Sequence, residues 1–182
     1  MISNFWPTKI LHNNIKDNVA VEQAFNYILS TFPHNEMPSN KSGINLASKE
    51  YVCSETKPII DFIEEQIKTY LENIWQFTGT FSFKVHATDH NQITVHNHSG
   101  SHLSGVFYLS VPQGDLLFYD PRYNANRGYP VSVRDKEFGH KTLELVEGDC
   151  VIFPSFLWHE STPNKSNLPR IIMPFDVWMR DE

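Results

Sequence analysis

The sequence predicts a mainly β protein, a double-stranded β-helix (jelly roll) with two N-terminal packing helices. From Phe81 onward, short β-type runs alternate with Gly, Pro, Asn and Asp, a spacing typical of sandwiches and barrels. Before Gly79, apolar residues instead recur at a spacing that keeps them on one helix face. We therefore expect a single domain over residues 1–182, with a helical part at 1–78 and the jelly-roll core at 79–182.

Two helices are expected in the first part. Residues 18–32 carry apolar side chains on one face. A broader apolar stripe runs from about Thr56 to Phe77, where Ser54 or Thr56 can serve as the N-cap and Pro58 is tolerated in the first turn. Such a stripe needs a sheet to cover. The polar segment at residues 39–54 is expected to be a loop.

Seven strands are expected in the second part, bounded by turn residues. They are residues 81–87, 92–98, 103–111, 115–120, 141–146, 150–153 and 170–179. The segment 122–140 is long and polar and contains Gly and Pro, so we expect a lid or substrate loop there.

Composition argues against several classes of function. The formal net charge is -6 and no run of Lys or Arg occurs, so nucleic acid is a poor candidate partner. No stretch approaches the roughly 20 apolar residues of a membrane helix, and the first ten residues lack a signal-peptide pattern. Cys53 and Cys150 form no CxxC pair, which favours two buried thiols in a reducing compartment. We expect a cytoplasmic protein.

A His-x-His pair is the first candidate site. If residues 92–98 form a strand, Ile93 and Val95 face one way while His96 and His98 face the other. Side chains at i and i+2 lie on the same face, so the two imidazoles can share one metal ion. Alone the pair is a weak motif, because a histidine is more often a surface or hydrogen-bonded core residue.

A third ligand must come from elsewhere, and His159 is the best candidate. It follows a tight turn, a buried strand and a proline stop, all within residues 148–154. His102 is a rival, but the turn at Gly100 makes its direction uncertain. The other histidines are expected to be structural, solvated or in loops: His12, His34, His86, His90 and His140.

Arg170 suggests what the metal site binds. It begins the last expected strand, eleven residues after His159, and its planar fork suits bidentate binding of a carboxylate. The alternative is a salt bridge at a strand end. Neutral imidazoles suit iron, zinc, copper or nickel, so the ligands alone do not name the metal. A zinc-dependent hydrolase would not need an arginine such as Arg170 beside the metal.

Four segments occur in order and carry a family resemblance. They are HNHSGSHLSGVFYL (96–109), YDPR (119–122), GDCVIFPSFLWHESTPN (148–164) and RIIMPFDV (170–177). With the opening FWPTKI, this combination resembles the small 2-oxoglutarate- and iron(II)-dependent oxygenases of marine bacteria and phages. The resemblance covers most of the chain from about Phe81 and implies a double-stranded β-helix, with Fe(II), 2-oxoglutarate and O2 as cofactor and co-substrates. A phage-encoded member would reside in the host cytoplasm.

The resemblance also implies roles for individual residues. His96, His98 and His159 correspond to the HxD/H pair and the distal histidine of this class, and Arg170 to the arginine that pairs with the distal carboxylate of 2-oxoglutarate. Tyr108 is similar to a tyrosine that assists this arginine, although it could equally be a core tyrosine.

Two departures from the family pattern stand out. His98 occupies the position of the usual carboxylate ligand, so either a three-histidine site or a two-histidine site with His98 hydrogen-bonded nearby is open. Phe83 and Val85 also replace a Trp and an Asn, so contacts with substrate or co-substrate there are expected to differ.

Three further roles rest on position in the sequence. Asp120 and Glu160 lie near enough to the histidines to be their hydrogen-bonding partners. Arg122 could bind substrate or stabilise its loop.

The function expected from these residues is a non-haem Fe(II)- and 2-oxoglutarate-dependent dioxygenase that hydroxylates its substrate and releases succinate and CO2. The alternatives are a cupin-type metalloprotein that does not use 2-oxoglutarate and a non-catalytic jelly-roll binding module. The expected substrate is a small molecule or a protein side chain, with variable loops selecting it. A homodimer through sheet edges is also open.

Overall fold

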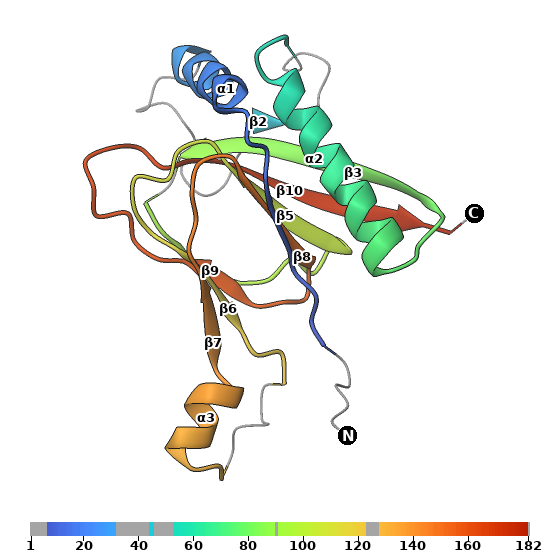
Figure 1. Cartoon of the computed structure of the whole chain (residues 1–182), viewed down its shortest axis with the longest axis vertical. Helices are drawn as coiled ribbons and strands as arrows, with labels where there is room; N and C mark the ends of the chain where they lie inside the picture. The colour runs from blue at the N-terminus through green and yellow to red at the C-terminus, as the bar shows by residue number, and fades with distance from the viewer. Residues whose placement is uncertain (1–6, 32–43, 46–52, 90, 123–127, 182) are drawn as a thin grey trace.

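The computed structural model describes residues 7–31, 44–45, 53–89, 91–122 and 128–181 (Figure 1). Two antiparallel sheets dominate this part of the chain, which confirms the predicted mainly β jelly-roll fold. Consecutive strands often lie in different sheets, so segments far apart in the sequence become neighbours in space.

The larger sheet has six strands in the order β1-β8-β5-β10-β3-β2. Their bounds are Leu11–Asn14 (β1), Ile44–Asn45 (β2), Thr80–Asp89 (β3), Leu103–Tyr108 (β5), Asp149–Pro154 (β8) and Ile171–Arg180 (β10). The smaller sheet has the order β4-β9-β6-β7. Its strands are Ile93–His96 (β4), Leu116–Tyr119 (β6), His140–Leu143 (β7) and His159–Ser161 (β9).

Two helices, α1 (Asn18–Thr31) and α2 (Lys57–Thr69), lie together on one side of the larger sheet (Figure 1). The stripe of α2 is fully buried at Ile59, Ile63 and Ile67, in one core with side chains of β3, β5, β8 and β10. Burying each isoleucine contributes about 1.5–3 kcal/mol. The stripe therefore fixes α2 on the sheet, as its pattern predicts.

The second helix begins after the predicted N-cap residue, Thr56, with Pro58 in its first turn, but it ends earlier than predicted. α2 ends at Thr69 and continues as a π-helical turn, η1 (Tyr70–Ile74), and Gln76 then adopts a positive φ of 54° that ends the helical path before Phe77. At the start, the Thr56 side chain makes no capping hydrogen bond. The Thr56 hydroxyl instead accepts the Cys53 N–H at 3.3 Å, and the Ser54 hydroxyl donates to Glu55.

A second core lies between the two sheets and contains Val106, Tyr108, Phe118 and Phe153. All six residues of β5 are buried, because the helices cover one face of the strand and the smaller sheet covers the other. This two-sided burial explains why β5 shows no polar alternation.

Four short elements are missing from the sequence-based prediction. β1 is held by β8, with Leu11 opposite Ile152, and β9 lies between β4 and β6. β2 falls in the expected loop 39–54, whose residues 39–43 and 46–52 lie outside the described residues. The expected lid at 122–140 contains a helix, α3 (Val131–Glu137), which projects beyond β7 (Figure 1). Its role as a lid stays a prediction.

Within the described residues, none of the helices combines the length and apolarity that a membrane crossing requires.

Candidate metal and co-substrate site

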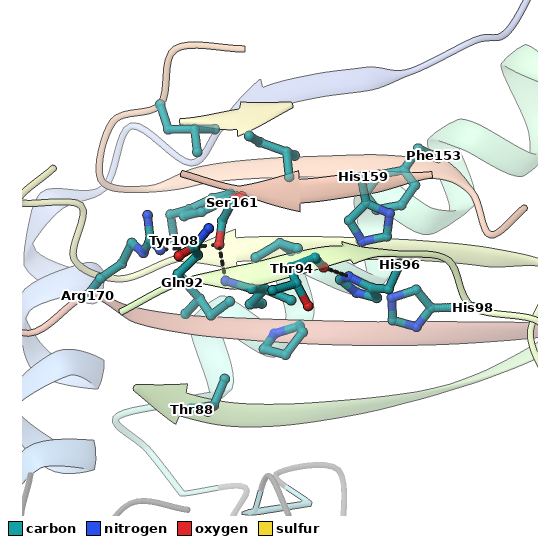
Figure 2. A pocket seen from close by; sticks show the side chains of 17 residues that line it. Thr88, Gln92, Thr94, His96, His98, Tyr108, Phe153, His159, Ser161 and Arg170 are labelled. Carbon is teal, nitrogen blue, oxygen red and sulfur yellow. Dashed lines mark hydrogen bonds between the residues drawn. The ribbon is translucent and has the colours of Figure 1, made fainter. Parts of the chain in front are cut away.

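Three histidines converge at one end of the space between the sheets (Figure 2). One nitrogen from each of His96, His98 and His159 lies within 4.8 Å of the others. The ring centroids of His96 and His159 are 4.3 Å apart, and His98 lies 5.1 and 5.3 Å from them. The structure thus brings together the three residues that the sequence singled out as ligands.

Strand pairing places two of the three rings. β4 and β9 are antiparallel neighbours, with His96 directly opposite His159. Ile93 lies opposite Ser161, so three steps along β4 match two along β9, which is a β-bulge. The predicted alternation is therefore wrong for Ile93, which lies on the same side as His96 and His98, because the bulge shifts the register; Val95 is 44% exposed. His98 lies beyond the end of β4, and its backbone N–H donates to the Ser155 carbonyl at 2.9 Å.

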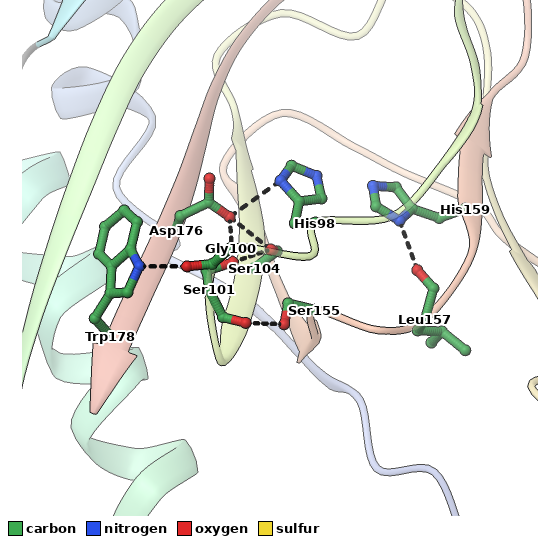
Figure 3. A network of polar contacts seen from close by, with 9 residues as sticks. All are labelled: His98, Gly100, Ser101, Ser104, Ser155, Leu157, His159, Asp176 and Trp178. Carbon is green, nitrogen blue, oxygen red and sulfur yellow. Dashed lines mark hydrogen bonds and ion pairs between the residues drawn. The ribbon is translucent and has the colours of Figure 1, made fainter. Parts of the chain in front are cut away.

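Each ring is anchored through Nδ1. The Nδ1 of His96 is 2.8 Å from the Thr94 carbonyl (Figure 2). The Nδ1 of His159 is 2.9 Å from the Leu157 carbonyl, and that of His98 is 3.1 Å from an Asp176 carboxylate oxygen (Figure 3). Carbonyl and carboxylate oxygens only accept, so each Nδ1 carries the proton. Each Nε2 then keeps its lone pair for a metal ion.

Burial keeps the imidazoles of His96 and His159 neutral. His159 is 4% exposed, and desolvation lowers its pKa to about 4, against the opposing effect of the Leu157 carbonyl. Desolvation also lowers the pKa of His96. Neutral rings are the form that binds metal, so both histidines are ready for coordination at neutral pH.

The His98 partner, Asp176, is absent from the sequence-based site. It lies on β10 and accepts hydrogen bonds from the hydroxyls of Ser101 and Ser104, at 2.9 and 2.6 Å. Burial alone would raise the pKa of Asp176, but the hydrogen bonds from His98 and the serines outweigh it and hold the pKa below its usual value. The available signal was the strand parity, which places a carboxylate on the face opposite the core residue Phe175.

Asp120 and Glu160, the partners expected from sequence, do not contact the histidines. Asp120 binds Arg122 at 2.6 Å, and Glu160 accepts the Tyr119 hydroxyl. The histidines are instead oriented by two carbonyls within their own segments and by one distant aspartate. Adjacency in sequence is misleading here because neighbouring side chains of a strand face opposite sides.

Arg170 lies at the other end of the same pocket and is 1% exposed (Figure 2). Its guanidinium donates to the carbonyls of Thr162 (2.9 Å) and Asn91 (2.7 Å) and to the Ser161 hydroxyl (3.2 Å). None of the ion pairs found among the described residues includes Arg170. The alternative interpretation, a salt bridge at a strand end, is therefore not what these residues show. Desolvation lowers its pKa, yet an arginine stays charged. A buried cation whose hydrogen bonds go to neutral oxygen atoms is suited to an anionic ligand.

Tyr108 lies beside Arg170 in the pocket and is 3% exposed. Burial raises the pKa of the phenol, against the opposing charge of Arg170. The phenol therefore remains a neutral hydroxyl that can donate one hydrogen bond. Tyr108 also belongs to the core between the two sheets. A role in binding and a role in core packing are therefore compatible for this residue.

The pocket that joins the two ends has a volume of about 440 Å³, within the range usual for small-molecule sites. Arg170 is the one Asp, Glu, Lys or Arg residue among the described residues of the pocket wall. The remaining walls are apolar or carry neutral polar groups, such as Thr88, Gln92 and Ser161.

The other histidines lie outside this cluster where they are described. His102 accepts the Met179 N–H at 3.0 Å, which removes it as a rival ligand. His12 lies in β1, where it contacts Asp149 at 3.0 Å, and His140 lies in β7 beside Tyr119. His34 and His90 lie outside the described residues.

Arg122 lies away from the histidines. Its guanidinium binds Asp120, donates to the Glu137 carbonyl at 3.0 Å and packs on the Phe138 ring at 4.9 Å. These contacts tie the end of α3 to the residues after β6, in line with a stabilising role. The two departures from the family pattern, Phe83 and Val85, face the core between the helices and the larger sheet.

Comparisons with known proteins agree with this geometry. Residues 82–176 match the family model described as "Putative 2OG-Fe(II) oxygenase". No curated protein sequence matches the chain.

Among solved structures, a prolyl-4-hydroxylase of Pseudomonas putida is similar at a TM-score of 0.64 and 13% identity, covering 96% of this chain and 94% of that one. HygX of Streptomyces hygroscopicus, with iron bound, is similar at a TM-score of 0.57 and 14% identity, covering 94% and 82%. The epimerase SnoN from nogalamycin biosynthesis, in complex with Fe3+, alpha ketoglutarate and nogalamycin RO, has a TM-score of 0.58 and 12% identity, covering 94% and 79%. At these identities the likeness concerns the fold.

Proposed function

Because the chain belongs to the 2OG-Fe(II) oxygenase family, we propose that His96, His98 and His159 hold its iron and that Arg170 binds the distal carboxylate of 2-oxoglutarate. The observation that carries this assignment is a single pocket with three converging imidazoles at one end and a buried arginine at the other. Iron(II), with 2-oxoglutarate and O2, supplies the oxidation of a substrate C–H bond, with release of succinate and CO2.

The donor chemistry fits iron(II). Three neutral Nε2 atoms suit a first-row divalent ion and leave coordination positions open for co-substrate and oxygen. The Nδ1 hydrogen bonds fix the rings, so the ligands do not reorganise when the ion binds. Arg170, held by hydrogen bonds to four neighbouring oxygen atoms, presents its charge in a fixed orientation. Tyr108 donates its hydroxyl proton to the same carboxylate.

Hydroxylation of an uncharged group is the reaction we propose. The wall offers apolar surface and neutral polar groups, and its arginine is reserved for 2-oxoglutarate. A small molecule or a protein side chain that inserts a neutral aliphatic or polar group meets no unpaired charge there. Nucleic acid is disfavoured by the net charge of -6.

Anaerobic calorimetry of 2-oxoglutarate binding to the iron(II)-loaded protein tests the assignment. Arg170→Lys keeps the charge but loses the planar fork, so binding should weaken about ten- to a hundred-fold. Arg122→Lys is the matched control, since that arginine lies outside the pocket, and should bind as wild type does.

Each alternative function has its own outcome in this experiment. Iron binding without 2-oxoglutarate binding would favour a cupin-type metalloprotein. Absence of stoichiometric metal from protein purified without an affinity tag would favour a non-catalytic module.

Two further properties are proposed from weaker support. Cys53 and Cys150 are both free thiols, which fits a cytoplasmic protein. β1 and β2 form the edges of the larger sheet, where a second copy could pair to give a homodimer. Light scattering at micromolar concentration tests the dimer.

A further inference from the structure

Among the described residues, Asp176 is the acidic group found in contact with the three-histidine cluster. Its Oδ1 lies 3.1 Å from the Nδ1 of His98 and accepts from the hydroxyls of Ser101 and Ser104 (Figure 3). His98 and Ser101 come from the segment that follows β4 and Ser104 from β5, while Asp176 comes from β10. One carboxylate oxygen is thus fixed behind a candidate ligand by three donors.

Charge distinguishes this site from the usual arrangement. A 2-His-1-carboxylate triad supplies one negative charge to the ion, whereas three neutral imidazoles supply none. A carboxylate hydrogen-bonded to a ligating imidazole raises the basicity of that ligand. In this chain the carboxylate has moved one position outward, from the ligand to the partner of the ligand.

We propose that His98 and Asp176 form one anionic ligand unit, in which Asp176 supplies, through the His98 ring, the negative charge that a carboxylate ligand supplies in the usual triad. The proposal rests on the proposed function, because it takes His98 as a ligand. Asp176 acts here as a positioning residue and does not touch the metal.

The charge of Asp176 is not cancelled by a cation in the described structure. Lys84 is its register partner on β3, but the Lys84 ammonium lies over the Trp178 ring, 5.6 Å from its centroid. Lys84 and Asp176 form no ion pair among the described residues. The ion-pair contact found for Asp176 is the one with His98.

A purely structural role for Asp176 would be to hold the segment at residues 97–101 on β10. That segment has a second attachment, because the Trp178 indole N–H donates to the Gly100 carbonyl at 2.6 Å. The two attachments can be removed separately, which separates the effect of the charge from the effect of the tether.

The test compares Asp176→Asn with Trp178→Phe. Asparagine keeps the size and the acceptor oxygen but removes the charge, while phenylalanine removes only the indole donor. Binding of Fe(II) and Co(II) is titrated anaerobically, and the visible absorption of the Co(II) protein reports the strength of its ligands. Melting of the metal-free variants checks that they fold.

We expect Asp176→Asn to weaken metal binding about ten- to a hundred-fold and to shift the Co(II) spectrum. Trp178→Phe should change affinity less than about two-fold. In a His98→Ala background, Asp176→Asn should change affinity little, because the unit through which it acts is gone.

An affinity and Co(II) spectrum unchanged by Asp176→Asn would overturn the proposal. So would an equal loss in the presence and absence of His98, since that would indicate a structural effect. If the wild-type protein binds neither ion, the proposed function itself fails, and this result is distinct from both.

Discussion

Gly105 in β5 lines the pocket, and replacing it with alanine should destabilise the protein. A Cβ built at this position would lie 2.2 and 2.5 Å from Phe175 ring atoms and 2.7 Å from the Val151 carbonyl oxygen. Phe175 is 2% exposed and packs in the core between the helices and the larger sheet. Val151 lies in β8, the strand next to β5. Neither can withdraw without moving β10 or β8. Alanine there combines an overpacked core with a displaced strand.

The expected cost of Gly105→Ala is about 3 kcal/mol, the upper end for overpacking. For a chain of this size, that lowers the melting temperature by roughly 6–12 °C. Thermal unfolding followed by circular dichroism measures the shift, and urea unfolding measures the free energy. Gly100→Ala is the matched control, because a Cβ there meets nothing within 4 Å.

The Phe175 contact can be tested directly. Phe175→Leu in the Gly105→Ala background removes the two nearest ring atoms and should recover part of the lost stability, although the Val151 carbonyl contact remains. Melting of Gly105→Ala within 2 °C of wild type, equivalent to about 0.5–1 kcal/mol, would refute the steric argument.

Three other predictions concern the site. The pKa of His159 lies at about 4 when folded, against 6.5 for a free histidine. As the pH falls, the unfolded chain therefore binds a proton at this histidine before the folded chain does. The free energy of unfolding of the metal-free protein should be at its full value above pH 6.5 and should fall by about 3 kcal/mol as the pH drops to 4. Urea unfolding at several pH values measures this, and His159→Gln should flatten the profile. Tyr108→Phe should weaken 2-oxoglutarate binding about ten-fold in calorimetry while iron affinity stays unchanged; an equal loss of both would contradict its assignment. Phe153 is fully buried, with its ring centroid 4.6 Å from that of His159, and Phe153→Ala should cost about 3–5 kcal/mol in urea unfolding, so a loss below 1 kcal/mol would contradict its place in the core.

The fold class follows from local patterns. The stripe of α2 and the apolar runs of β5 and β8 are visible in the sequence because burial acts on consecutive residues. β1 (LHNN) and β9 (HES) have no such pattern and exist because neighbouring strands supply their hydrogen bonds. Tertiary pairing therefore decides the elements that composition does not show.

The site residues also fall into two groups, those predictable from the sequence and those that depend on tertiary structure. His96 and His98 could be paired from spacing alone, since two residues of extended chain return a side chain to the same face. Asp176 could not be linked to His98, because 78 positions separate them and the contact depends on how β10 crosses the segment after β4. The bulge in β4 also brings Ile93 to the side of the histidines, against expectation, while His96 and His98 still lie close together.

The pairing of His96 with His159 across β4 and β9 has a consequence for local dynamics. β4 is a four-residue strand at the free edge of its sheet, and such strands exchange their amide protons through local opening. An ion held by both histidines would fasten this edge strand to its neighbour. At a metal concentration one hundred times the dissociation constant, the linkage is worth about 2.7 kcal/mol, so amide protection in β4 would report iron occupancy without any substrate.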